Sequence, residues 1–207
     1  NPQNPKWKNR DRFVLSAGHG SMLLYSALHL AGFDVSLNNI KQFRKLNSPT
    51  AGHPEFGHVP GVETTTGPLG QGVAMAAGMA LGNKIIQDRF ELPQKLWDGK
   101  VVVLAGDGCM MEGISSETGS FAGHLALNNL IVFYDANDIC LDGPISECFT
   151  ENTALRFEAQ GWNVQQIDGH DLDEIHTAYQ FALESTKPTL IVAKTTIGKF
   201  SPATQGT

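Results

Sequence analysis

Short apolar runs alternate with longer segments of helical character along this chain. The runs that predict strands lie at 13–16, 101–104, 130–134, 163–167 and 189–195. Helical length and periodicity instead characterise the segments 21–31, 36–46, 73–90, 151–160 and 171–185. Strands that alternate with helices predict right-handed crossovers and an α/β fold, with a largely parallel β-sheet covered by helices on both faces.

Local signals set the expected ends of several helices. Ser36 is a typical N-cap residue, and Asp171-x-x-Glu174 has the spacing of a capping box. Lys187-Pro188 should end the last helix, because proline cannot continue one. With 207 residues, of which 41% are hydrophobic, the chain has enough apolar material for one sizeable core.

The segment 47–66 has many turn residues and little periodicity. A loop of this length within a compact domain is usually functional or disordered. Its content favours function, because it carries His53, Glu55, His58 and Glu63. The spacing of the two histidines does not by itself predict a zinc site, since no cysteine or third spaced ligand accompanies them.

The most informative stretch runs from Lys100 to Gly143. The first predicted strand within it ends at Gly106-Asp107-Gly108, and the second ends at Asp135-Ala136-Asn137, so that Asn137 follows Asp107 by thirty positions. In parallel sheets, ligands bind at the carboxyl ends of the strands. A carboxylate and an amide oxygen suit Mg²⁺ or Ca²⁺, and the flanking glycines would let backbone N–H groups approach a phosphate.

The glycine-rich segments also suit two other interpretations. Gly-Asp-Gly alone is also typical of an ordinary turn before a helix, and the asparagine after the next strand shifts the balance towards a metal–diphosphate site. The segment Gly67-Pro-Leu-Gly-Gln-Gly72 lacks a preceding predicted strand. A dinucleotide-binding fingerprint requires such a strand, so that interpretation is disfavoured.

Several segments together resemble one family of thiamine diphosphate enzymes, the transketolases. They are DRFVLSAGHG, AGHPEFGHVPGVETTTGPLGQG, GDGCMMEGISSE, YDANDICLDG and KPTLIVAKTTIG. They follow one another in the family's order and cover nearly the whole chain. The resemblance implies the pyrophosphate-binding domain of the thiamine diphosphate-binding fold.

The resemblance also implies roles for individual residues. The expected metal ligands are Asp107, Asn137 and the backbone carbonyl of Ile139. His53 would face the substrate channel, where it could hydrogen-bond to the sugar and transfer a proton. His19 would contact the cofactor diphosphate and act with His53 in catalysis. The remaining expected cofactor contacts are made by Gly67, Leu69, Gly108 and Asn137.

The implied reaction is the transfer of a two-carbon ketol unit from a ketose phosphate to an aldose phosphate, as in the pentose phosphate pathway. The expected cofactors are thiamine diphosphate and Mg²⁺ or Ca²⁺. In this family the cofactor lies between the two subunits of a homodimer. Residues 1–207 would form a single domain, incomplete at both ends and without the pyrimidine-binding and C-terminal domains, so we expect the chain alone to be inactive.

Two alternatives to transketolase stay open at this stage. One is a dihydroxyacetone synthase or another thiamine diphosphate enzyme, such as a deoxyxylulose phosphate synthase. The other is a non-catalytic fragment or regulatory module that keeps the fold. The intact Asp107 and Asn137 argue against the second, because a site without function would be free to lose them.

Charge and cysteine content narrow the class of partner and the compartment. The net charge of −6 gives no electrostatic footprint for nucleic acid or for an anionic membrane. No apolar run is long enough to span a bilayer. The three cysteines form no C-x-x-C pair and their number is odd, which favours free thiols in a reducing cytoplasm.

Overall fold

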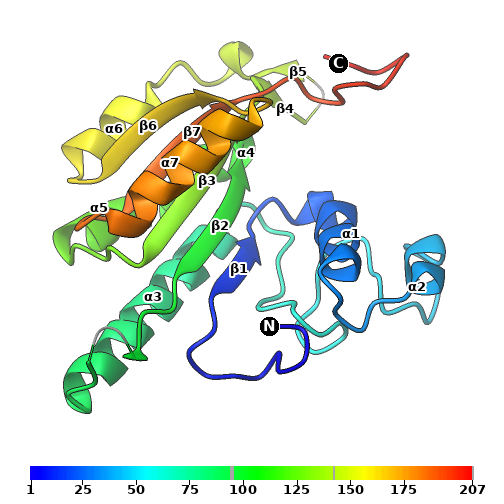
Figure 1. Cartoon of the computed structure of the whole chain (residues 1–207). Helices are drawn as coiled ribbons and strands as arrows, with labels where there is room; N and C mark the ends of the chain where they lie inside the picture. The colour runs from blue at the N-terminus through cyan, green and yellow to red at the C-terminus, as the bar shows by residue number, and fades with distance from the viewer. Residues whose placement is uncertain (94–95, 142, 207) are drawn as a thin grey trace.

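The computed structural model describes residues 1–93, 96–141 and 143–206. Its centre is a five-stranded sheet with the strand order β1-β2-β3-β7-β6, and all four neighbouring pairs are parallel (Figure 1). These strands span Arg12–Leu15 (β1), Val101–Gly106 (β2), Leu130–Ala136 (β3), Asn163–Asp168 (β6) and Thr189–Lys194 (β7). All five predicted strands are therefore present.

The central strands are apolar because both of their faces are covered. In β7 the residues from Thr189 to Ala193 are all buried, and in β3 the run Leu130–Val132 is buried as well. Parallel strands covered on both faces are typically continuous runs of this kind rather than alternating ones. The apolar runs of the sequence therefore predicted strands at the middle of the sheet.

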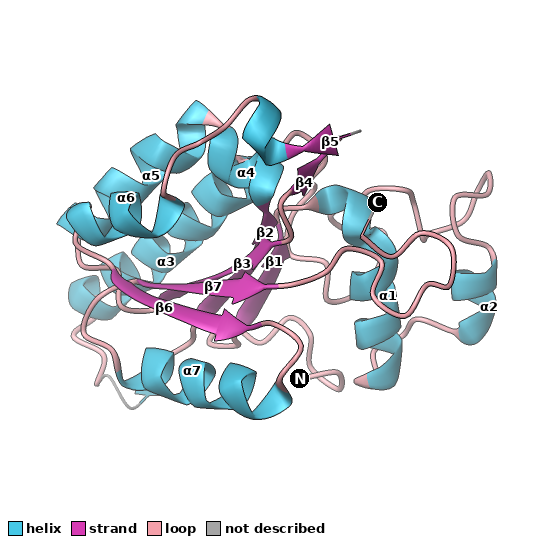
Figure 2. Cartoon of the chain, turned by 90° about the horizontal axis from the view of Figure 1, so that it is seen from above, coloured by secondary structure: helices cyan, strands magenta, loops and turns pink. Residues whose placement is uncertain are grey.

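Helices lie on both faces of the sheet (Figure 2). The residues from α3, α5 and α6 pack together with Val101, Val103 and Val132 in one large apolar cluster. On the opposite face, α1 packs near Leu15 and Leu104, and α7 packs against Ile131 and Ile191. The helices span Ser21–Leu30 (α1), Leu37–Lys41 (α2), Gln71–Arg89 (α3), Asp107–Met111 (α4), Gly113–His124 (α5), Thr153–Ala159 (α6) and Leu172–Glu184 (α7).

The helix predicted over 36–46 needs correction. The helix expected over 36–46 ends at Lys41, and left-handed backbone at Arg44 (φ 62°) and Asn47 (φ 63°) follows. It buries no residue, so nothing stabilises further turns. Ser36 does cap it, in a reciprocal pair with Asn39.

The capping box expected before α7 forms only in part. Asp171 accepts hydrogen bonds from the backbone N–H groups of Asp173 and Glu174, as an N-cap should. The carboxylate of Glu174 accepts instead from the N–H of Asp168, at the end of β6. Glu174 therefore ties the helix to the preceding strand rather than completing its cap.

The crossover between β2 and β3 and the segment after β3 are more complex than expected. The crossover consists of two helices, α4 and α5, with a break at Glu112. After β3 the chain forms a small antiparallel hairpin, Ile139–Cys140 (β4) with Gly143–Pro144 (β5), which was not predicted. Short 3₁₀ helices span Gly18–Gly20 and Ile145–Glu147. Of the helices described, none combines the length and apolar character that crossing a bilayer requires.

Candidate metal and diphosphate site

A pocket of about 420 Å³ opens at the carboxyl edge of the sheet, beside the ends of β2 and β3. This is the position at which open α/β sheets bind ligands. The pocket is lined by residues from five separate parts of the sequence. They include seven of the eight predicted site residues: His19, Gly67, Leu69, Asp107, Gly108, Asn137 and Ile139.

Asp107 is the buried anion of this pocket. The residue is 2% exposed, and it lies at the start of α4, directly after β2. One carboxylate oxygen accepts from the backbone N–H groups of Asn137 (3.1 Å) and Asp138 (3.0 Å), and the other accepts from the hydroxyl of Tyr134 (2.5 Å). Burial raises the pKa of Asp107, and these hydrogen bonds oppose that rise. A cation beside it would favour the ionised form further.

Asn137 lies on the turn that follows β3, and Ile139 begins β4 directly after that turn. The side-chain oxygen of Asn137 accepts from the backbone N–H of Ile139 (3.0 Å), and its side-chain nitrogen donates to Asp135 (3.1 Å). Asp138 between them has φ 64°, a left-handed conformation that folds the turn back towards Asp107. The structure therefore brings the predicted ligand residues of both strands together, as the spacing of thirty residues indicated.

Glycines allow the walls of the pocket to approach one another closely. A Cβ atom at Gly108 would lie 2.6 Å from Cδ1 of Leu69 and 3.1 Å from Sγ of Cys140. Gly70 has φ 78°, and a Cβ atom there would lie 2.9 Å from Cβ of Glu112. A larger residue at Gly108 would displace the side chain of Leu69, and one at Gly70 would press on the break between α4 and α5 at Glu112.

The two predicted catalytic histidines occupy neighbouring but different positions. His19 lies in the 3₁₀ turn before α1, is exposed and lines the pocket. His53 does not line it; its ring lies about 3.5 Å from where a Cβ atom of Gly67 would be, and it faces an adjoining open pocket with Arg44 and Lys45. Gly67 thus separates the two histidine positions.

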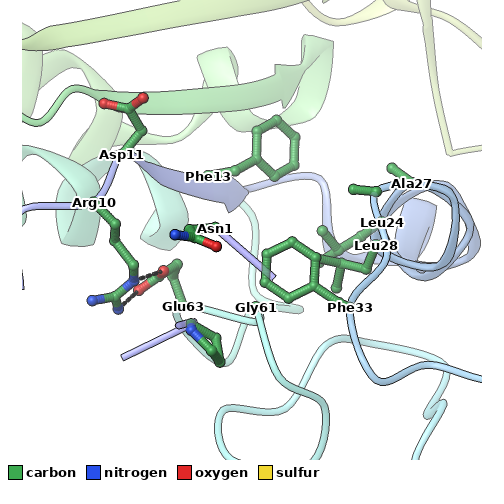
Figure 3. Close-up of a pocket in the computed structure, with 12 residues that line it drawn as sticks. Asn1, Arg10, Asp11, Phe13, Leu24, Ala27, Leu28, Phe33, Gly61 and Glu63 are labelled. Carbon is green, nitrogen blue, oxygen red and sulfur yellow. Dashed lines mark hydrogen bonds and ion pairs between the residues drawn. The ribbon is translucent and has the colours of Figure 1, made fainter. Parts of the chain in front are cut away.

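A bidentate ion pair holds the long loop that carries His53 and Gly67. Arg10 donates from Nε and Nη2 to the two carboxylate oxygens of Glu63, at 2.7 and 2.6 Å (Figure 3). Glu63 therefore has a structural role in fixing the loop against the N-terminal segment. Beside this ion pair lies a mainly apolar pocket of about 240 Å³, walled by Phe13, Leu24 and Phe33 and their neighbours. None of the predicted site residues lines it.

Three polar residues at the edge of the site have no distinctive pattern in the sequence. Tyr134 and Asp135 appeared only as the end of an apolar strand and the start of a turn, and Thr195 as the end of another strand. In the structure Tyr134 contacts Asp107, while Asp135 contacts Asn137 and accepts a hydrogen bond from Thr195. Asp135 could have been found from its position, because it is a polar residue two positions before the predicted ligand Asn137.

The residues present fit a hard divalent cation bound to a diphosphate. Within the described ranges no group of three or more His, Cys, Asp or Glu side chains could hold a metal ion. The predicted set has a different composition: one carboxylate, one amide oxygen and one backbone carbonyl, with room for diphosphate oxygens. Magnesium is typically bound in this way, through one or two protein carboxylates together with phosphate oxygens and water.

Comparison with known proteins identifies the family. The family model described as transketolase, thiamine diphosphate binding domain, matches residues 1–207. The chain belongs to this family. The resemblance noted in the sequence is thereby confirmed, and so is thiamine diphosphate as the cofactor of the family.

Individual transketolases are similar over the entire chain. The enzyme of Geobacillus stearothermophilus is 54% identical, and transketolase 1 of Escherichia coli is also 54% identical; in both, the match covers 100% of this chain and 31% or 32% of the relative. A crystal structure of the Campylobacter jejuni transketolase superposes with a TM-score of 0.96 at 52% identity and covers 100% of this chain and 32% of that one. The chain therefore spans about a third of the length of these relatives, and the fold prediction is confirmed.

Proposed function

We propose that this chain supplies the diphosphate and metal half of a transketolase active site. The complete protein would transfer a two-carbon ketol unit from a ketose phosphate to an aldose phosphate, in the pentose phosphate pathway. The observation that carries this proposal is the convergence of Asp107 and Asn137 on one pocket, in a chain whose relatives are named transketolases. A Pichia stipitis transketolase that is 47% identical was solved in complex with sedoheptulose-7-phosphate, which supports sugar phosphates as substrates.

The residues around the pocket have separable tasks in this proposal. Asp107, the side-chain oxygen of Asn137 and the carbonyl of Ile139 would bind Mg²⁺ or Ca²⁺, which neutralises the diphosphate. His19 would donate a hydrogen bond to a diphosphate oxygen. Gly67, Leu69 and Gly108 would let the cofactor rings and phosphates approach the backbone. When bound, thiamine diphosphate supplies the nucleophilic carbon that carries the two-carbon unit, and the protein orients it.

His53 would act on the sugar rather than on the cofactor. Its ring lies against Gly67 and is exposed, with Arg44 and Lys45 in the same open pocket. A histidine in this position could hydrogen-bond to a sugar hydroxyl and transfer a proton. The neighbouring cations would attract an anionic substrate. These features support the assignment of His53 to the substrate side of the site.

We further propose that residues 1–207 form one pyrophosphate-binding domain and that the site is completed by other parts of the protein. A second subunit of a homodimer, or domains outside these residues, would supply the pyrimidine half. The outer side of α3 and α5 supports such a contact: Phe121 is 47% exposed and Ile85 is 52% exposed, and Gly78 has no neighbour within 4 Å of a Cβ position. The chain alone would then be inactive. A cytoplasmic location stays a prediction from the cysteine pattern.

A dihydroxyacetone synthase is the second candidate. It would use the same metal and diphosphate residues, and the sequence of the loop around His53 agrees with either enzyme. Product analysis with formaldehyde or ribose 5-phosphate as acceptor separates them. Exclusive use of formaldehyde would replace the transketolase assignment.

The test of the proposed site is calorimetric titration with thiamine diphosphate, with and without Mg²⁺. We expect metal-dependent binding by the full-length protein, because the cation links the diphosphate to Asp107. Binding of equal strength with and without metal, or no binding, would refute the proposal. Titration of the 207-residue chain then shows how much of the affinity this domain provides by itself.

A further inference from the structure

Hydrogen bonds occupy most of the lone pairs of the Asp107 carboxylate, which limits how it can bind a cation. An ionised carboxylate has about four lone-pair positions. Two of those on Asp107 accept backbone N–H groups, from Asn137 and Asp138, and a third accepts the hydroxyl of Tyr134. These donors come from three directions and fix the plane of the carboxylate. One lone pair is left, so Asp107 can offer a cation a single oxygen contact.

Tyr134 is the only one of these donors that is a side chain, so it can be removed by substitution. It is 6% exposed, and its hydroxyl lies 2.5 Å from Oδ1 of Asp107. Without that hydroxyl, Oδ1 would have two free lone pairs, and only the two backbone hydrogen bonds to Oδ2 would still restrain the carboxylate. The carboxylate would then be fully ordered only when the metal ion binds, and this ordering would lower the affinity for the metal.

Asn137 is oriented by a different neighbour. The carboxylate of Asp135 can only accept hydrogen bonds, so the atom of Asn137 that faces it at 3.1 Å has to be the nitrogen. The side-chain oxygen therefore lies on the other side, where it accepts from Ile139 and keeps one lone pair. Thr195, after β7, donates to the second oxygen of Asp135 and holds that carboxylate in place.

We propose that Tyr134 and Asp135 are positioning residues for the metal site, Tyr134 acting through Asp107 and Asp135 acting through Asn137. The inference rests on the proposed function of that site. The two residues are consecutive at the end of β3, and side chains at consecutive positions of a strand point to opposite faces of the sheet. One strand end can therefore support two ligands from two sides.

The first experiment substitutes Tyr134→Phe in the full-length protein and titrates Mg²⁺ calorimetrically at a fixed concentration of thiamine diphosphate. We expect Mg²⁺ affinity to fall about 10- to 100-fold, as is typical when a residue that orients a metal ligand is lost. Turnover at saturating Mg²⁺ should recover to within about twofold, since no group that touches the substrate has changed. Tyr179→Phe on α7, which removes a hydroxyl away from the site, is the matched control and should leave Mg²⁺ affinity unchanged.

The second experiment separates the acceptor role of Asp135 from its charge. Asp135→Leu removes both acceptors, frees the amide of Asn137 to turn over, and should also weaken Mg²⁺ binding about 10- to 100-fold. Asp135→Asn keeps one oxygen that can face Asn137 and should rescue most of that loss. Asp173→Leu, at an exposed position of α7, is the matched control.

The outcomes distinguish this inference from the proposed function. If the wild-type protein shows no metal-dependent cofactor binding, the proposed function fails and the inference fails with it. If the wild type binds and both Tyr134→Phe and Asp135→Leu bind Mg²⁺ within twofold of it, the inference alone is overturned. Should Asp135→Leu not fold, Tyr134→Phe decides: a folded Tyr134→Phe with unchanged Mg²⁺ affinity refutes the positioning role.

Discussion

At the scale of single residues, the site depends on where hydrogen-bond donors and acceptors point. Asp107 was predictable from its Gly-Asp-Gly context, and Asn137 from its spacing. The residues that hold them were not, because Tyr134 and Asp135 also suit an ordinary strand end. Their role depends on which lone pairs remain free, and that is set by three-dimensional neighbours rather than by residue type.

The relative importance of Asp107 and His19 gives a prediction at this scale. Asp107→Asn keeps the shape of the side chain but removes the charge that a cation would neutralise, so thiamine diphosphate binding with Mg²⁺ should weaken by at least about 3 kcal/mol. His19→Ala removes one charge-assisted hydrogen bond and should cost about 1.5–3 kcal/mol. Calorimetry of both variants tests the order. A larger loss for His19→Ala would contradict the assignment of Asp107 to the metal.

At the scale of elements, α3 and the turn before α1 are held together by a glycine. A Cβ atom at Gly72 would lie 2.5 Å from Cα of Ser16, which is backbone at the end of β1. The chain that follows Ser16 leads into the turn that carries His19. Close packing at Gly72 therefore places the start of α3 and the segment with Gly67 and Leu69 beside His19.

We expect Gly72→Ala to lower the free energy of unfolding by about 3 kcal/mol, the upper end for overpacking, because backbone rather than a flexible side chain must move. Gly113→Ala is the control: it lies in the first turn of α5 with nothing within 4 Å of its Cβ position. It should raise the free energy of unfolding by less than about 1 kcal/mol, because alanine favours a helix more than glycine does. Urea denaturation of the two variants measures both. Equal stability of Gly72→Ala and wild type would show that α3 can shift away from β1.

Helix length is also decided at this scale. The segment 36–46 has helical periodicity and a good N-cap, but it forms only Leu37–Lys41. It lies at the periphery of the molecule, away from the sheet (Figure 1). Ile40 and Phe43 are only partly buried against the α1 cluster, and no residue of α2 is fully buried. With so little apolar surface to bury, a helix of this length is marginal, and the chain enters turns instead.

At the scale of the whole molecule, the three tyrosines report on three separate apolar clusters. Tyr25 lies in the cluster of α1, Tyr134 in the cluster shared by α3 and α5, and Tyr179 beside the cluster of α7. Burial is the main cause that raises the pKa of each above its ordinary value of 10.0. The sequence contains no other tyrosine.

These shifts predict that the protein loses stability at alkaline pH. Above pH 10 the unfolded chain releases tyrosine protons that the folded state retains, so the unfolded state binds fewer protons and the free energy of unfolding falls as pH rises. The contribution is fully present below pH 10 and decreases by at most about 1.4 kcal/mol per pH unit for each tyrosine. Urea denaturation at successive pH values measures the slope.

Single Tyr→Phe variants isolate each cluster from the lysines and cysteines that titrate in the same range. Each variant should unfold with a shallower dependence on pH than the wild type. Tyr179→Phe should have the smallest effect, since Tyr179 is only partly buried whereas Tyr25 is fully buried. Three variants with the wild-type slope would show that these tyrosines titrate alike in the folded and unfolded states.

The sequence by itself determined the order of the main strands and helices, the parallel sheet and the family, and it predicted that Asp107 and Asn137 lie close together. These properties depend on local periodicity, on residue chemistry and on spacing along the chain. Only the tertiary structure decided that β7 lies between β3 and β6, that His53 is separated from the pocket by Gly67, and that Tyr134 and Asp135 face the ligand residues. The strand order and the contact of Tyr134 with Asp107 depend on segments far apart in the chain, which packing against the sheet selects and no local pattern records. The contact of Asp135 with Asn137 depends on how the turn after β3 folds.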